Sequence, residues 1–304
     1  MLFLQELDAL KQFLDQLDCA YLENEPMKDH TTFQIGGPAD LFIKPGRVDV
    51  IRDIVCKCTE LGIPLFALGG GSNLLVSDTG VRGAVLSTGG LNDISFEGGC
   101  DIVCGAGVKL SKICSFALEQ SLTGIEFAWG IPGTCGGAVM MNAGAYGGEM
   151  KDVIVEAQHV TPQGEIETLT AQEMHLGYRS SIYQKNGGVI TSVRLRLTPG
   201  NAEMIRLQMD DLMNRRRQKQ PLDLPSAGST FKRPAGHFAG TLIEECGLKG
   251  LTVGGAMVSE KHAGFIVNTG GATSSDVRQL IEKITHEVFM QTGITLECEV
   301  RFVK

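Results

Sequence analysis

The segment from Trp129 to Gly148 reads W-G-I-P-G-T-C-G-G-A-V-M-M-N-A-G-A-Y-G-G and holds seven glycines and no charged residue. A flexible linker would be rich in Ser, Lys or Glu, whereas this segment carries apolar side chains that would pack into protein. Glycines among buried residues mark places where the backbone comes very close to another group or takes a positive φ. The segment therefore predicts a tightly packed loop that is neither a linker nor a helix.

A second glycine run, Gly69-Gly70-Gly71-Ser72-Asn73, follows an apolar stretch over residues 64–68 that predicts a strand. Consecutive glycines at the end of a strand can present several backbone N–H groups to a diphosphate, and Ser72 and Asn73 add side-chain donors. Taken alone, the run is also compatible with a tight strand-to-strand turn. Together, the two glycine segments indicate loops that hold a flat, anionic cofactor.

The composition excludes several classes of protein. Glycine makes up 39 of the 304 residues, nearly twice the usual ~7% share, and it is clustered rather than periodic, which excludes collagen. The net charge of −8 disfavours a nucleic-acid partner. The nine cysteines form no C-x-x-C, the N-terminus has no basic leader, and no apolar stretch reaches the ~20 residues of a membrane span. We expect a reduced, cytoplasmic protein with no membrane association.

Hydrophobic periodicity predicts alternating helices and strands at both ends of the chain and hairpins in the middle. This order is typical of an α+β fold with mixed sheets. Helices are expected over 2–18, 48–61, 108–121, 201–217, 239–246 and 274–291. Strands are expected over 40–43, 64–68, 83–87, 101–104, 153–160, 165–169, 189–197, 252–258, 264–268 and 295–303, with a loop over 220–230.

Several common site motifs are missing. Gly105-Ala106-Gly107 suggests a dinucleotide fingerprint, but Leu110 stands where the third glycine belongs, so a tight turn is the better interpretation. The six histidines are scattered, and Cys56 and Cys58 are poorly spaced for a metal. We therefore expect no metal site.

Polar clusters in the second half of the chain are candidates for chemistry. These are Tyr178-Arg179-Ser180-Ser181, the loop over 226–232, and Glu297 with Glu299, which would share one face of a terminal strand. Arg215-Arg216-Arg217 and Lys219 lie near an expected helix C-terminus. They form either a solvated helix end, with Arg216 and Arg217 on the surface, or a small phosphate site.

Five motifs occur in order along the chain: T-T-F-x-I-G-G, G-G-G-S-N-L-L, I-P-G-T-x-G-G-A-V-x-M-N-A-G-A-Y-G, Y-R-x-S and A-G-S-x-F-K. Together they resemble the UDP-N-acetylenolpyruvoylglucosamine reductase family, the flavoenzymes of peptidoglycan precursor synthesis, from His30 to Arg301. No long insertion follows Tyr178, so the chain resembles the shorter, second subtype. The resemblance implies an N-terminal helix (1–25), a flavin domain of the p-cresol methylhydroxylase/vanillyl-alcohol oxidase type (26–199) and a smaller α+β substrate domain (200–304).

The resemblance also implies the reaction, in which NADPH reduces a non-covalent FAD and the enolpyruvyl ether of UDP-N-acetylglucosamine accepts hydride at C3. Arg179 matches the arginine that stabilises the developing enediolate, and Glu299 matches a glutamate that binds the same group or orients the arginine. Ser229 matches the serine that protonates C2, with Lys232 in support.

The remaining contacts follow from the same motifs. Arg233 and Gly264 replace asparagines found in many members, which leaves the substrate contacts at these two positions open. The substrate would contact Tyr178, Arg215, Lys219 and Lys232. The expected FAD contacts are Gly69, Gly70, Gly71, Ser72, Asn73, Leu74, Ile131, Pro132, Gly133, Gly136, Gly137, Asn142, Ala143 and Gly144.

Two alternatives stay open from the sequence. An oxidase of the same superfamily would keep the flavin and use O₂, although it has no evident need for Arg179 and Ser229. A non-catalytic nucleotide-binding or flavin-sensing module would make Arg179, Ser229 and Glu299 dispensable. We expect a monomer, since no coiled coil or interface stripe is visible.

Overall fold

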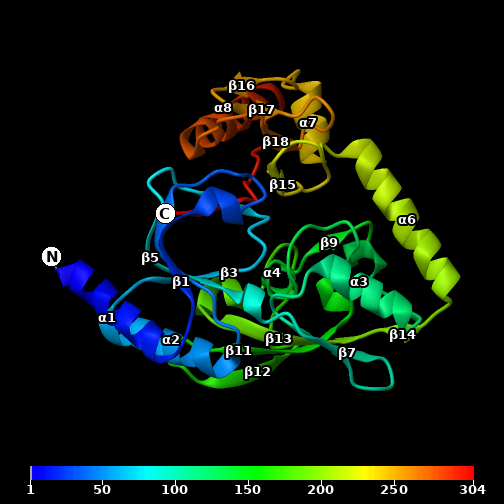
Figure 1. Cartoon of the computed structure of the whole chain (residues 1–304). Helices are drawn as coiled ribbons and strands as arrows, with labels where there is room; N and C mark the ends of the chain where they lie inside the picture. The colour runs from blue at the N-terminus through cyan, green and yellow to red at the C-terminus, as the bar shows by residue number, and fades with distance from the viewer. Residues whose placement is uncertain (1) are drawn as a thin grey trace. The chain divides into compact units, whose positions relative to one another are not determined.

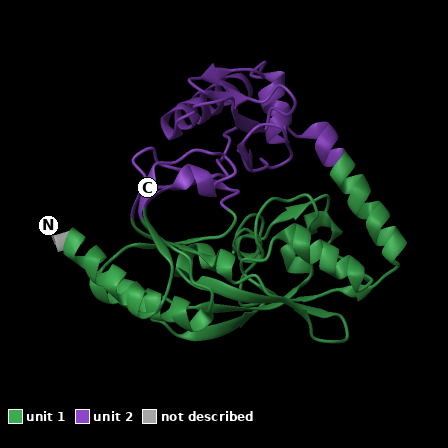
Figure 2. Cartoon of the chain, viewed as in Figure 1, with its two compact units in different colours: residues 1–23, 41–70, 83–214 green, residues 24–40, 71–82, 215–304 purple. Residues whose placement is uncertain are grey.

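The computed structural model describes residues 2–304, except for the side chains of Leu2 and Phe3, and the chain forms two compact units (Figure 2). Unit 1 contains the residues up to 23 together with 41–70 and 83–214. Unit 2 contains 24–40, 71–82 and 215–304, so two early segments belong with the C-terminal third. The functional division at residues 25/26 and 199/200 stays a prediction.

Unit 1 is built on a five-stranded antiparallel sheet of order β12-β11-β13-β7-β6 (Figure 1). The predicted hairpin is confirmed as β11 (Ile154–Val160) and β12 (Ile166–Thr170). The other strands are β13 (Val189–Arg196), β7 (Asp101–Gly105) and β6 (Ile94–Phe96). Alternate residues of β7 are buried, as expected for a strand with one face on the core.

Helices cover this sheet. α2 (Val48–Leu61) packs against β11 and against α1 (Leu2–Gln16), and it ends where Gly62 takes a φ of +66°. α3 (Leu110–Glu119) and the first part of α6 (Ala202–Lys219) also belong to unit 1. Short elements complete the unit: α4 (Cys135–Met140), α5 (Tyr183–Asn186), the pair β9 (Gly144–Ala145) and β10 (Gly148–Glu149), the pair β8 (Leu122–Thr123) and β14 (Thr198–Pro199), and 3₁₀ turns at 88–90, 126–128 and 150–152.

A four-stranded sheet of order β1-β2-β5-β3 contains three of the five points where the chain passes from one unit to the other. Three of its strands include a unit boundary, and β3 pairs with β5 in parallel. The strands are β1 (Tyr21–Pro26), β2 (Pro38–Ile43), β5 (Val81–Ser87) and β3 (Leu65–Leu68).

Unit 2 has its own core around an antiparallel sheet of order β15-β18-β17-β16. The strands are β15 (Ser226–Ser229), β18 (Phe265–Asn268), β17 (Ala256–Val258) and β16 (Thr252–Val253). α8 (Ser274–Thr292) packs on β16, β17 and α7 (Ala239–Glu245), and the Thr273–Asp276 capping box starts it. Beside them, β19 (Arg301–Val303) runs parallel to β4 (Leu74–Val76), and a 3₁₀ turn spans 27–30.

Four predictions about elements were wrong. The glycine segment contains the helix α4, and the expected loop over 220–230 contains β15. The strand expected over 252–258 is the hairpin β16–β17, because Gly254 takes a φ of +53° at the turn. Of the strand expected over 295–303, only β19 is formed, because residues 295–300 join the rest of unit 2 through single backbone contacts.

Within residues 2–304, no helix combines the length and the apolar composition that a membrane span requires.

The core of unit 2 provides a test of the fold. Ile284 on α8 is fully buried, so Ile284→Ala should lower the free energy of unfolding by about 2–5 kcal/mol through lost burial and a cavity. Glu282→Ala on the exposed side of the same helix is the matched control and should change it by less than ~0.5 kcal/mol. Chemical denaturation followed by circular dichroism measures both; equal losses would contradict the assigned core face.

Candidate functional site

The two glycine segments meet backbone to backbone in unit 1. A Cβ atom added at Gly70 would lie 2.8 Å from the Cα of Gly133, and one added at Gly69 would lie 2.6 Å from Thr134 Oγ1. Neither glycine of the first run could carry a side chain without a shift of its neighbours. We call Gly69, Gly70, Gly133 and Thr134 the glycine cradle.

The helix α4 follows the glycine cradle directly and is held by the chain that leaves β7. The Cys135 N–H donates to Val108 O at 2.8 Å, and the Gly136 N–H donates to Ala106 O at 2.9 Å. Gly136 is required here because its Cβ would lie 2.9 Å from that of Ala106. Gly105-Ala106-Gly107 is therefore a turn that supports the second glycine segment, as the sequence predicted.

Thr134 carries an unsatisfied group at the centre of the glycine cradle. Its side chain is buried, and its Oγ1 has no hydrogen-bond partner among the described residues. A buried hydroxyl without a partner costs about 1–3 kcal/mol. The neighbouring Gly69, Gly70 and Gly133 are half-buried, so the cradle fits a polar or anionic ligand that approaches bare backbone closely.

The side chain of Asn142 is hydrogen-bonded within the protein. Its side chain is fully buried, and its Nδ2 donates to Glu149 Oε2 at 2.7 Å and to Gly177 O at 2.9 Å. Its Oδ1 accepts from the Lys151 N–H at 2.9 Å. Both amide hydrogens are therefore used within the protein, and the side chain holds neighbouring backbone in place.

Arg179 lies on a tight turn in unit 1 beside the glycine segment. Gly177 and Ser180 pair across the turn, and Arg179 takes a φ of +54°, which is unusual for a residue with a side chain. Its guanidinium donates to Gly144 O at 3.0 Å and stands 5.2 Å from the centroid of the exposed Tyr178 ring. The predicted Tyr178–Ser181 cluster is thus compact and adjoins residues 140–144.

Unit 2 joins three of the sequence motifs around Gly71. The φ of Gly71 is +61°, and a Cβ there would lie 2.0 Å from His30 O, so the two segments touch without room for a side chain. Thr32 Oγ1 donates to Ser226 O at 2.7 Å. The Asn73 side chain donates to Glu299 O at 3.2 Å. Leu74, like Gly71, is buried, whereas Ser72 and Asn73 are half-buried.

Ser229 and Glu299 lie on adjacent backbone segments of unit 2. The Glu299 N–H donates to Thr230 O at 2.8 Å, and Phe231 forms an isolated bridge with Cys298. Ser229 is exposed, and its hydroxyl makes no hydrogen bond to the described residues. Lys232 is ion-paired with Glu297. Glu297 and Glu299 precede β19, so the prediction that they share one face of a terminal strand was wrong.

The basic cluster does sit at a helix C-terminus, in the last turns of α6. Arg215, Arg217 and Lys219 are exposed there. Arg216 is only 8% exposed, so its predicted place on the helix surface was wrong. A helix C-terminus is stabilised by positive charge, which is the solvated-helix-end interpretation of this cluster.

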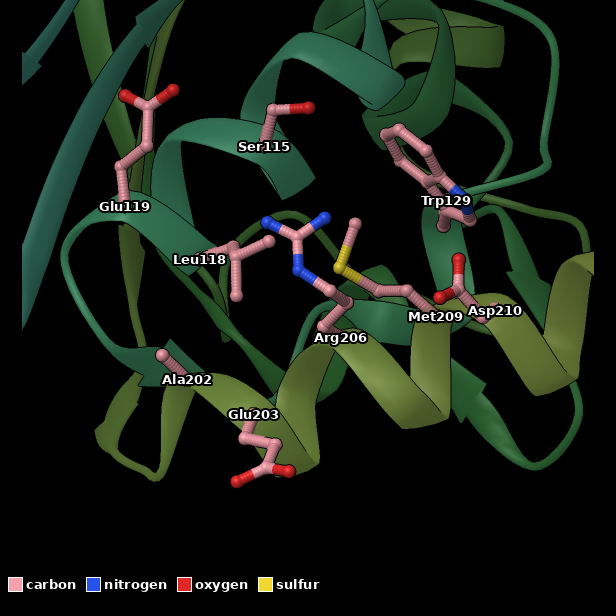
Figure 3. A pocket seen from close by; sticks show the side chains of 9 residues that line it. All are labelled: Ser115, Leu118, Glu119, Trp129, Ala202, Glu203, Arg206, Met209 and Asp210. Carbon is pink, nitrogen blue, oxygen red and sulfur yellow. The ribbon is translucent and has the colours of Figure 1, made fainter.

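Within residues 2–304, no three side chains of His, Cys, Asp or Glu lie together in an arrangement that could hold a metal ion. Unit 1 also has a cavity of about 470 Å³ between α3 and α6, where Arg206 and Met209 extend toward Leu118 (Figure 3). It is lined by Ser115, Leu118, Glu119, Trp129, Ala202, Glu203, Arg206, Met209 and Asp210, which include no residue predicted for cofactor or substrate.

Sequence reasoning named the loop of Thr134 but not its side chain, and it missed Gln184. The Gln184 Nε2 donates to Met140 O at 2.9 Å and to Arg179 O at 3.0 Å. The residue follows Y-R-x-S by only two positions, but a lone glutamine carries no signal of its own.

Comparisons with known proteins identify two domains in the chain. The model of an FAD binding domain matches residues 39–170, and that of the C-terminal domain of UDP-N-acetylenolpyruvoylglucosamine reductase matches residues 220–303. A reductase of that name from Syntrophomonas wolfei is 50% identical over 283 residues, which cover 92% of this chain and 94% of the relative. The chain belongs to the UDP-N-acetylenolpyruvoylglucosamine reductase family.

Other members of the family support the assignment. The reductase of Caldanaerobacter subterraneus is 49% identical over 97% of both chains. The crystal structure of the reductase from Thermus caldophilus superposes with a TM-score of 0.81 at 36% identity, over 94% of this chain and 99% of that one. The predicted family, the α+β class and the flavin-binding domain are confirmed. The glycine cradle and Thr134 Oγ1 lie within the matched FAD domain and fit that cofactor.

The glycine cradle can be tested by one methyl group. In Gly70→Ala the new Cβ meets the backbone of Gly133, which cannot rotate away, so the purified protein should lose most of its bound flavin. In the control Gly46→Ala, a Cβ meets nothing within 4 Å, so flavin content should not change. The ratio of absorbance at ~450 nm to that at ~280 nm measures occupancy. Full occupancy in Gly70→Ala would contradict the proposed cradle.

A half-buried histidine, His262, predicts how the stability of unit 2 depends on pH. Burial lowers the pKa of His262 below its ordinary value of 6.5, and its Nδ1 accepts from the Gly264 N–H at 3.1 Å. Lys249 and Lys219 lower the pKa further, whereas Glu244 opposes them. As the pH falls below ~6.5 the unfolded chain binds a proton that the folded chain does not, so stability declines.

The thermal midpoint should therefore fall from pH 7 to pH 5, and His262→Asn should flatten the decline, because asparagine keeps an acceptor but does not titrate. His286→Asn on the exposed side of α8 is the control. Scanning fluorimetry over this range measures all three proteins; an equally steep decline in His262→Asn would contradict the assignment to His262.

Proposed function

We propose that this chain is the UDP-N-acetylmuramate dehydrogenase of peptidoglycan precursor synthesis, which uses NADPH to reduce the enolpyruvyl ether of UDP-N-acetylglucosamine. The observation that carries the proposal is identity of about 50% to reductases of this family over nearly the whole of both chains. FAD, when bound, takes electrons from NADPH and supplies hydride to C3 of the enolpyruvyl group.

The residues proposed to hold FAD are those predicted from the sequence, with Thr134 added and with Asn142 acting through its backbone. Gly69, Gly70 and Gly133 offer backbone without side chains, and Thr134 adds a buried hydroxyl without a partner. Gly71, Ser72, Asn73, Leu74, Ile131, Pro132, Gly136, Gly137, Ala143 and Gly144 remain proposed contacts. Asn142 is proposed to contribute through its backbone, because both hydrogens of its side-chain amide are engaged.

Arg179 is proposed to stabilise the negative charge that develops on the substrate carboxylate. Its guanidinium stays protonated at any working pH and can donate two parallel hydrogen bonds to a carboxylate. One nitrogen already donates to Gly144 O, which fixes the direction of the group. Fixed donors stabilise a developing charge without having to reorganise during the reaction.

Ser229 is proposed to donate the proton to C2. Its side chain is exposed, and its hydroxyl makes no hydrogen bond to residues 2–304, so it is available to a ligand. Serine is a weak acid, and only a strongly basic, carbanion-like carbon could take its proton. Glu299, whose backbone is hydrogen-bonded to Thr230 next to Ser229, is proposed to bind the same carboxylate or to orient Arg179.

The proposed substrate contacts are Tyr178, Arg215, Lys219 and Lys232. Tyr178 is 54% exposed, and the two cations of α6 are exposed, so all three can meet a sugar diphosphate. Lys232 would have to exchange its ion pair with Glu297 for a phosphate or for Ser229. We further propose that the chain is a monomer. We also propose that it is cytoplasmic, because all nine cysteines are free thiols, as is usual in a reducing compartment.

The test separates the two halves of the reaction. Under anaerobic conditions, NADPH should bleach the flavin of Ser229→Ala at the wild-type rate, whereas the enolpyruvyl substrate should restore its ~450 nm band about 10²–10⁴-fold more slowly. Ser95→Ala, on the exposed side of β6, is the matched control and should behave like wild type.

The other outcomes discriminate between functions. Full rates in both halves for Ser229→Ala would remove Ser229 from the mechanism. A wild-type flavin that is reoxidised by air and not by the substrate would favour the oxidase. A chain that neither contains nor binds FAD would contradict the cofactor site.

A further inference from the structure

The amide of Gln184 links the turn that carries Arg179 to the end of α4. Gln184 Nε2 donates to Met140 O at 2.9 Å, in the last residue of α4, and to Arg179 O at 3.0 Å. The amide thus connects the backbone of the proposed catalytic arginine with the glycine segment. The same nitrogen also lies 3.5 Å from Met141 Sδ, so all of its hydrogen-bond partners are groups of the protein.

The backbone of this turn needs such support. Arg179 takes a φ of +54°, and a side chain in this region costs on the order of 1 kcal/mol unless the surroundings impose it. The Gly177–Ser180 pair closes the turn, and Asn142 holds Gly177 O at its start. Gln184 contacts the strained residue directly, because its amide donates to the carbonyl of Arg179 at 3.0 Å.

The guanidinium end of Arg179 is fixed to the same segment. It donates to Gly144 O at 3.0 Å, four residues beyond Met140. The carbonyl of Arg179 is thus connected through Gln184 to Met140, and its guanidinium is connected to Gly144. Both residues lie in the predicted FAD-binding segment. A shift of the backbone at Arg179 would move the guanidinium relative to this segment even if the side chain kept its rotamer.

We propose that Gln184 is a positioning residue that sets the place of Arg179 with respect to the flavin segment. This inference rests on the proposed role of Arg179. Ser181 also donates to Met140 O, at 2.7 Å, but it is Gln184 whose amide reaches the carbonyl of Arg179 as well. Removing the amide would leave the turn attached to α4 while freeing the carbonyl of Arg179.

The first experiment replaces the amide by a side chain of similar size without donors. Gln184→Met should leave reduction of the flavin by NADPH unchanged and should slow reoxidation by saturating enolpyruvyl substrate on the order of 10–100-fold, as expected for a misplaced catalytic group. Gln172→Met, at an exposed position of unit 1, is the matched control and should leave both rates unchanged. Unchanged reoxidation in Gln184→Met would overturn the proposal.

A double-mutant cycle tests whether Gln184 acts through Arg179. Once Arg179→Ala has removed the guanidinium, adding Gln184→Met should slow reoxidation no further. The same fold-loss in both backgrounds would overturn the inference and leave the role of Arg179 intact. A wild-type rate in Arg179→Ala would instead contradict the proposed function of Arg179, and the positioning role with it.

A second variant keeps the test open if Gln184→Met folds poorly. Gln184→Glu keeps the shape but turns a carboxyl toward the carbonyl oxygens of Met140 and Arg179. The ionised carboxyl repels them, whereas the protonated one can donate again. The reoxidation rate relative to wild type should therefore rise from pH 8 to pH 5, and a constant ratio would overturn the proposal.

Discussion

The approach of two bare backbones at the glycine cradle determines much of unit 1. Gly70 lies so close to Gly133 that a methyl group would not fit between them, and the same is true of Gly136 and Ala106 one step further along the chain. These contacts bring the end of β3, the turn after β7 and the start of α4 together in one place. Gly70 meets backbone and Gly136 meets the Cβ of Ala106, and neither position has room for a side chain, so the glycines at these two positions follow from that constraint.

Most helices could be predicted from the sequence, because their apolar residues recur at helical spacing and a glycine or proline follows the last turn. α2 ends at Gly62, where the backbone turns left-handed, and the hairpin at 161–164 has an evident turn sequence. The helix α4 could not be predicted, since glycines disfavour a helix and only the carbonyl groups of Ala106 and Val108 stabilise its first turn. In the same way, a β-hairpin of two- and three-residue strands in 252–258 has too few residues for an alternation to be visible.

For the site, the sequence could indicate which residue types are present but not which hydrogen bonds and ion pairs their side chains form. Arg179 and Ser229 stand in distinctive motifs. By contrast, one of the hydrogen bonds that occupy the amide of Asn142 is made to Gly177, 35 residues along the chain. The burial of Arg216 is likewise not visible in its sequence neighbours. Glu297 and Glu299 look equivalent by their spacing, yet one is paired with Lys232 and the other lies beside the backbone of Thr230. The chemistry of a carboxylate is set by such partners, which spacing does not reveal.

The chain has a net charge of −8, yet both proposed ligands, a dinucleotide cofactor and a sugar diphosphate, are anions. A long-range positive field cannot attract them, so recognition must be local. The proposed FAD contacts are mainly backbone groups of half-buried loops, which add no net charge and are fixed by packing. The proposed substrate contacts on α6 are exposed cations, whose attraction salt screens readily. Neutral donors fixed by packing suit a cofactor that stays bound, and exposed charges screened by salt suit a substrate that must leave after each turnover.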